Sequence, residues 1–311
     1  MARLTLLDIA KRAGNDQAVG IVESMSQANA LLERLPFRPI NGSSFRFGRR
    51  TALPTVNVRG YNQGVAASKS TVIQVMVECM NIAGMSEVDM LLADDDPRGV
   101  NAVRAEEDAS FLAATGNKFN YLAYYGNSAT NANERDGVAN ILNALSLANV
   151  AGAGGSGGSS IYFFALNDAS GPQGRRKGMQ GVLANGQLPS GKDMGIQYVL
   201  DADSNKYPAY VTDFIFRPGL AIYDTLSVGR LANIGASNKP TVALISSVIQ
   251  GMFPFRPSFM TCSKVVYGYI LELVASTQPR VAWNPATGDL TVDAVPVYID
   301  ENIGASETTV S

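Results

Sequence analysis

Two stretches of alternating residues, 43–53 and 71–82, most constrain how this chain can fold. Side chains in a strand alternate between faces, so Phe45 and Phe47 share one face of the first stretch, and Val75 and Val77 share one face of the second. The pattern predicts a long two-stranded β-hairpin arm, roughly 37 Å in length, whose tip is residues 54–70. A lone two-stranded ribbon is marginally stable in water. We therefore expect a neighbouring copy of the same chain to cover its apolar face.

The composition of the 311 residues excludes several classes of protein. The chain is 46% hydrophobic with a net charge of -2, so it can bury a core, and no global basic character favours wrapping nucleic acid. No apolar run reaches the ~18 residues of a membrane span, and the start is too weakly apolar for a signal peptide, so a cytoplasm-like compartment is expected. Histidine is absent, which removes the commonest general base and metal ligand. Cys79 and Cys262 have no zinc-site spacing.

The order of predicted elements indicates a mixed α+β chain without βαβ rhythm or internal repeat. A long helix is expected after Asp96, which is suited to an N-cap, with Pro97 at the first helical position. Other helices are predicted at 4–12, 17–35, 133–148, 240–252 and 264–275. Strands are predicted at 161–166, 196–200, 207–216, 220–228 and 258–262, with shorter pieces between 290 and 299.

Charge is distributed unevenly between the arm and the segment that follows it. Residues 40–82 carry a net charge of +4, and residues 83–108 carry -6. A basic arm and an acidic helix start of similar length suit head-to-tail contact between copies, in which charge sets the register. The alternatives are two solvated faces, or pairing within one chain. The candidate intersubunit contacts are Arg46, Arg49, Arg50, Arg59, Lys69, Asp94, Asp95, Asp96, Glu106 and Glu107.

Several short motifs resemble chemical sites, but each has a simpler structural interpretation. Residues 152–157 match GxGxxG, yet a predicted helix precedes them and a strand follows, the reverse of the dinucleotide-binding order. Three consecutive acids, 94–96, lack the further spaced ligands of a magnesium or calcium site and suit a helix cap. The basic loop 174–178 could contact DNA phosphates, although a solvated turn explains it as well. No catalytic, cofactor-binding or metal-binding residue is predicted.

The element order and several local stretches resemble the major capsid protein of tailed double-stranded-DNA bacteriophages, which has the Hong Kong ninety-seven-type fold. The resemblance spans nearly the whole chain. The stretches are Leu6-Leu7-Asp8-Ile9-Ala10-Lys11-Arg12, Ala52-Leu53-Pro54-Thr55-Val56, Asn62-Gln63-Gly64, and the body from Lys206-Tyr207 to Gly229-Arg230-Leu231-Ala232-Asn233-Ile234.

The resemblance implies a domain plan. Residues 1–39 would form an N-terminal arm and 40–82 the extended hairpin (E-loop). Residues 83–133 would form a peripheral domain with a spine helix, joined by strands from 205–236. Residues 134–204 and 237–311 would form the axial domain and return segments.

The resemblance also implies a function and partners. The chain would self-assemble through hexamers and pentamers into the icosahedral head shell of a virion, assembled in the host cytoplasm and enclosing double-stranded DNA held by non-specific contacts. A separate scaffolding protein, a portal and cement or decoration proteins would be its other partners, since the chain lacks a charged, fused scaffold segment. Neither a cofactor nor a membrane is expected. The alternatives are an encapsulin-like compartment shell and, more distantly, a nucleotide-cofactor-binding enzyme.

Overall fold

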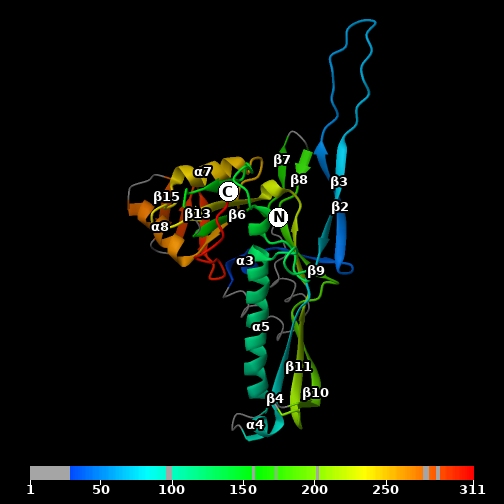
Figure 1. Ribbon diagram of the computed structural model, residues 1–311, viewed down its shortest axis with the longest axis vertical. Coiled ribbons are helices and arrows are strands. Elements are labelled where there is room, and N and C mark those ends of the chain that lie inside the picture. The colour runs from blue at the N-terminus through cyan, green and yellow to red at the C-terminus, as the bar shows by residue number, and fades with distance from the viewer. Residues whose placement is uncertain are drawn as a thin grey trace.

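The fold is organised around one long helix, α5 (Val100–Tyr125), which links two sheet-containing regions (Figure 1). The computed structural model describes residues 29–95, 100–155, 158–171, 174–200, 203–275, 280–284 and 288–311. A two-stranded arm projects from the side of the molecule, at the opposite end from the start of α5 (Figure 1). The α+β class expected from the sequence is confirmed.

The largest sheet has seven strands in the order β15–β16–β17–β14–β6–β13–β5. Its interior strand β6 (Ser159–Phe164) is buried along its whole length because both faces are covered. Ile161 and Phe163 belong to the core cluster that includes residues of α7 and α8, whereas Tyr162 and Phe164 join the cluster that includes α5. The other elements of this region are β5 (Val150–Gly152), β13 (Val228–Ile234), α7 (Val242–Gly251), β14 (Phe259–Cys262), α8 (Lys264–Ala275), β15 (Val281–Asn284), β16 (Asp289–Val292) and β17 (Val295–Ile299).

A three-stranded antiparallel sheet, β10–β11–β4, packs against the other half of α5. Phe111 of the helix stacks on Phe214 at 5.5 Å between ring centroids, and Phe119 meets Phe216 edge-on at 5.7 Å. Phe111 and Phe119 are eight residues apart, about two helical turns, which places them on the same face of α5. The strands are β4 (Ile82–Asp89), β10 (Ser190–Leu200) and β11 (Lys206–Phe216).

The arm leaves the body beside a second three-stranded sheet, β1–β9–β12. The arm itself consists of β2 (Ser44–Ala52) and β3 (Thr71–Glu78). The sheet contains β1 (Phe37–Ile40), β9 (Met179–Ala184) and β12 (Pro218–Ile222), and β7 (Ala169–Gly171) with β8 (Gly174–Arg176) forms a small hairpin nearby. The remaining short helices are α3 (Ala30–Arg34), α4 (Met90–Asp95), α6 (Val138–Ile141) and the 3₁₀ turn η1 (Thr225–Ser227).

Most predicted elements are present, but three differ from the sequence-based expectation. The strand predicted at 220–228 is interrupted, since β12 ends at Ile222 and the 3₁₀ turn η1 precedes the start of β13 at Val228. The helix predicted at 133–148 is wrong, since only Val138–Ile141 is helical. The preceding side chains of Asn127, Asn131 and Asp136 accept hydrogen bonds from nearby backbone amides, which compete with helix formation. The second arm strand ends at Glu78 rather than at residue 82, and the chain continues into β4.

Part of the expected N-terminal arm cannot be compared with the structure. The helix predicted at 4–12 and most of the one at 17–35 lie outside the described residues, as do Asp96 and Pro97. Residues 29–39 form α3 and most of β1. In the part of the chain that is described, no helix combines the length and apolar character needed to cross a membrane.

Candidate assembly surfaces

The foot of the arm is anchored to its own chain. Phe45 faces Val77 across the hairpin and Phe47 faces Val75, so the four side chains share one face. On that face the ring of Tyr223 lies 4.9 Å from Phe47 and 6.2 Å from Phe45, measured between centroids. Tyr223 of the same chain therefore covers part of the apolar face of the first arm strand, which needs no second molecule there.

The outer half of the arm has no such support. Every residue from Thr51 to Lys69 is exposed, and the tip projects away from the body (Figure 1). Val58 and Tyr61 are as accessible as in an extended peptide, at 102% and 101%. An exposed apolar group concentrated on one projecting element is typical of an interaction site. The large apolar side chains exposed on the outer arm are Leu53, Val56, Val58, Tyr61 and Val65.

The five basic candidates on the arm are available for contact with another molecule. Four are exposed and Arg49 is half-buried. Within the described ranges, none of the five forms an ion pair. The only acid of this segment, Glu78, lies 2.8 Å from Arg135 and is thus neutralised by its own chain. The exposed four are Arg46, Arg50, Arg59 and Lys69.

The acidic candidates lie at the far end of the subunit from the arm. Asp94 in α4 and Glu107 in α5 are exposed. The side chains of Asp95 and Glu106, and all of Asp96, lie outside the described part of the structure. Because α4 and the start of α5 lie at one end and the arm at the other (Figure 1), the two charged surfaces cannot meet within one molecule. This removes the alternative of intramolecular pairing for the described candidates.

Asp108 of α5 lies beside a group of polar side chains between this helix and the β10–β11–β4 sheet. Arg104, one turn earlier, lies 2.7 Å from Asp193 of β10 and 3.4 Å from the hydroxyl of Thr212 in β11. One carboxylate oxygen of Asp108 is buried without a hydrogen-bond partner among the described residues. Burial raises the pKa of Asp108, and the charges of Asp193 and Glu107 raise it further, against the opposing effects of Arg104 and Thr212.

We expect Asp108→Asn to stabilise the free subunit at pH 7, raising its melting temperature by about 1–3 °C. The folded state binds the Asp108 proton more tightly than the unfolded chain, so ionisation of this group destabilises the fold as pH rises through the unfolded pKa. The advantage of asparagine should therefore disappear at a pH below that unfolded value. Calorimetry of both proteins across this pH range tests the prediction, and a pH-independent difference would contradict it.

A buried ion pair joins strand β13 to the C-terminal segment. Arg230 of β13 lies 2.7 Å from Glu307, with side chains only 5% and 7% exposed. The guanidinium also donates to the carbonyl oxygens of Ala139 and Leu142. The hydroxyls of Tyr125, Tyr162 and Ser160 donate to Glu307.

Burial raises the pKa of Tyr162, and the Glu307 carboxylate raises it further. Sequence reasoning missed this network, since its members lie up to 182 residues apart.

The residue patterns that resembled chemical sites are described by the structure only in part. The glycine-rich segment joins β5 to β6, so the strand-to-helix turn of a dinucleotide site is absent, although residues 156 and 157 lie outside the described ranges. Among the described residues, no group of three acids or cysteines could hold a metal ion. Cys79 and Cys262 are both buried free thiols, and burial raises the pKa of each.

Comparison with known protein families identifies the family to which this chain belongs. The family model described as "Major capsid protein GP7" matches residues 13–267. The chain belongs to this family of phage major capsid proteins. Its function is to form the capsid shell of the virion, into which it self-assembles, and its role is structural.

Solved structures show the same fold. A chain of the bacteriophage epsilon15 structure is 19% identical, with 88% of this chain and 87% of that chain covered and a TM-score of 0.62. The bacteriophage JBD30 capsid is 10% identical, with 88% and 91% covered and a TM-score of 0.53. Curated protein sequences contain no significant match. The resemblance to the Hong Kong ninety-seven-type fold is confirmed.

Proposed function

We propose that this major capsid protein forms hexamers and pentamers that close into an icosahedral head around double-stranded DNA. In each ring, the arm of one subunit docks on the acidic start of α5 in the next. Head-to-tail contacts of this kind close into rings. Apolar side chains of the outer arm provide affinity, and the opposite charges of arm and helix set the register.

The exposed outer arm is the observation that carries the proposal. Its five large apolar side chains are 47–102% exposed, and its basic residues form no ion pair with an acid of the described residues. Complementary acids lie on the same molecule but at its other end (Figure 1). A second copy supplies both the missing apolar surface and the missing carboxylates.

We also propose a domain division that adjusts the sequence-based plan. The arm is the E-loop, and α5 with the β10–β11–β4 sheet forms the peripheral domain. Strand β10 was expected in the axial domain, but its hydrogen bonding to β11 along Ser190–Leu200 favours the peripheral one. The seven-stranded sheet with α7 and α8 forms the axial domain.

The proposed partners follow from the family and from the surface charge. A separate scaffolding protein, a portal and cement proteins would complete the head. Packaged DNA would be held by non-specific contacts, for which the basic residues of 174–178 are candidates. No residue is assigned a catalytic, cofactor-binding or metal-binding role.

Light scattering after size-exclusion chromatography tests the proposal. We expect the chain, expressed with the other head genes of its phage, to elute as megadalton particles with fivefold and sixfold capsomers in electron micrographs. A stable monomer under these conditions, or particles built from capsomers of another symmetry, would refute it.

A further inference from the structure

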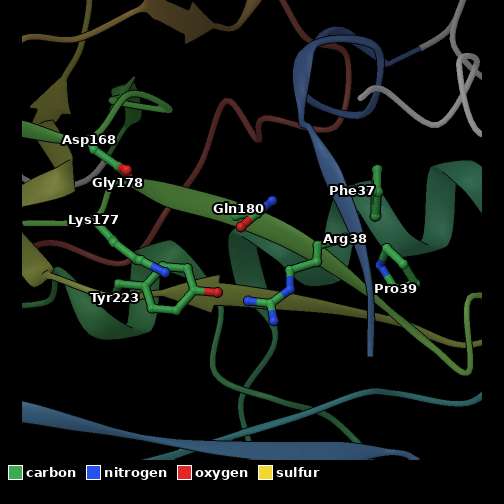
Figure 2. Close-up of a pocket in the computed structure, with 8 residues that line it drawn as sticks. All are labelled: Phe37, Arg38, Pro39, Asp168, Lys177, Gly178, Gln180 and Tyr223. Atoms are coloured by element: carbon green, nitrogen blue, oxygen red, sulfur yellow. The ribbon is translucent and has the colours of Figure 1, made fainter. Parts of the chain in front are cut away.

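Tyr223 separates two pockets at the foot of the arm. The first has a volume of about 310 Å³ and is bounded by β1, β9 and the residues after β8, including Arg38, Lys177 and Gln180 (Figure 2). The second, of about 600 Å³, lies between the arm strand β2 and the segments 176–177 and 223–225. Tyr223 and Lys177 line both pockets, so the two adjoin beneath the arm, and together they are called the Tyr223 groove.

The hydroxyl of Tyr223 is an unsatisfied polar group in this groove. The residue is only 8% exposed, and its oxygen has no hydrogen-bond partner among the described residues. Figure 2 shows this oxygen directed toward the Arg38 guanidinium across the first pocket. A buried hydroxyl is normally hydrogen-bonded, because leaving one unpaired is costly. The position therefore points to a group supplied from outside the chain.

Cations surround the hydroxyl in excess over acids. Lys177 lies 5.4 Å from the centre of the Tyr223 ring, and neither it nor Arg38 has an ion-pair partner in the described ranges. Arg176 is 3.3 Å from Asp224, which neutralises that pair. The groove lining contains five basic residues (Arg38, Arg49, Arg50, Arg176, Lys177) and two acids (Asp168, Asp224), a net charge of +3.

We propose that the Tyr223 groove binds a carboxylate side chain of a second copy of this chain. The inference rests on the proposed function and names one contact of the docked arm. Both pockets are large enough to admit a carboxylate side chain, and only a slender group can approach the hydroxyl of Tyr223, a residue that is more than nine-tenths buried. A DNA duplex presents its phosphates on a broad cylinder and is a poorer fit. Exposed carboxylates such as Glu107 lie at the far end of each copy and are accessible to a second molecule.

A zero-length cross-link identifies the bound group. Carbodiimide joins a lysine amine only to a carboxylate in direct contact with it. Shells assembled from mixed ¹⁵N-labelled and unlabelled copies would be treated, digested and examined by mass spectrometry. We expect Lys177 joined to an aspartate or glutamate peptide carrying the other isotope label. Links within one copy only, for example to Asp168, would overturn the inference. Protection of Lys177 that appears only in DNA-filled shells would also overturn it and would favour a phosphate ligand.

Two substitutions test the groove energetically. Tyr223→Phe keeps the ring against Phe45 and Phe47 and removes only the hydroxyl, and Lys177→Gln removes one charge. Each should raise the subunit concentration needed for assembly about tenfold, equivalent to about 1.4 kcal/mol. Lys264→Gln, an exposed lysine of α8 without an ion pair in the described ranges, is the matched control and should have no effect.

The possible outcomes separate this inference from the proposed function. Unchanged or improved assembly of Tyr223→Phe would overturn the inference, because it would mean that the hydroxyl stays unpaired in the shell. A wild-type chain that forms no shells would instead overturn the proposed function.

Discussion

Replacing Arg49 and Arg50 of the arm by glutamate should give a folded subunit that no longer assembles into shells. Both side chains lie just outside the Phe47–Tyr223 contact and line the Tyr223 groove, and neither has an acidic partner in the described chain, so the fold loses little. In the shell, each variant arm would place acids against the acidic start of α5. Like charges brought together at an interface cost several kcal/mol. Analytical ultracentrifugation at micromolar protein should therefore detect subunits or small oligomers in place of megadalton particles.

The charge-preserving variant Arg49→Lys, Arg50→Lys is the matched control. It retains the positive charge of the arm, and we expect it to assemble with at most a modest loss. Circular dichroism and the melting temperature of the free subunit verify that the double glutamate variant is folded. Shells of normal yield and stability from that variant would contradict the electrostatic role of the arm.

Glu307→Ala should destabilise the free subunit by about 3–5 kcal/mol, because it leaves the Arg230 guanidinium buried without its counter-ion. It would also remove the acceptor of three hydroxyl groups. Reversible chemical denaturation at pH 7 measures the loss. If the variant does not accumulate as soluble protein, Glu307→Gln retains most of the hydrogen bonding and should show a smaller loss in the same direction.

The exposed pair Lys239–Glu272 provides the comparison for this prediction. Its atoms are 2.6 Å apart, but its side chains are 45% and 58% exposed. Solvent screens such a pair, so Glu272→Ala should cost no more than about 1 kcal/mol. Equal effects of Glu307→Ala and Glu272→Ala would show that the buried network is not a major determinant of stability.

Local patterns in the sequence predicted those elements whose periodicity or capping is strong. The first arm strand, α8 and the strand at Phe259–Cys262 agree closely with the structure. The segment 133–148 was predicted as a helix from its apolar spacing, but asparagine and aspartate side chains bind the backbone there. The order of strands in the seven-stranded sheet depends on contacts between distant segments, which periodicity does not encode.

The candidate surfaces were predictable only in part, for the same physical reason. The uneven charge of the arm and of the helix start is a property of contiguous segments and is visible in the sequence. The Tyr223 groove joins β1, the arm, the β8 end and β12, so no local motif marks it. Likewise, Phe45 and Phe47 are predicted as apolar residues awaiting cover, yet a tyrosine some 180 residues later covers them in part.

The aromatic contact at the base of the hairpin holds that end in place and leaves the distal end without contacts to the described body. Movement at Phe47 is resisted by the tyrosine ring 4.9 Å away, whereas nothing in the described body restrains the ribbon beyond Thr51. A closed surface tiled by one kind of molecule has to accommodate slightly different angles between neighbours. In such a shell, the distal ribbon is the part that can bend to fit those different angles, while the base of the hairpin keeps its orientation.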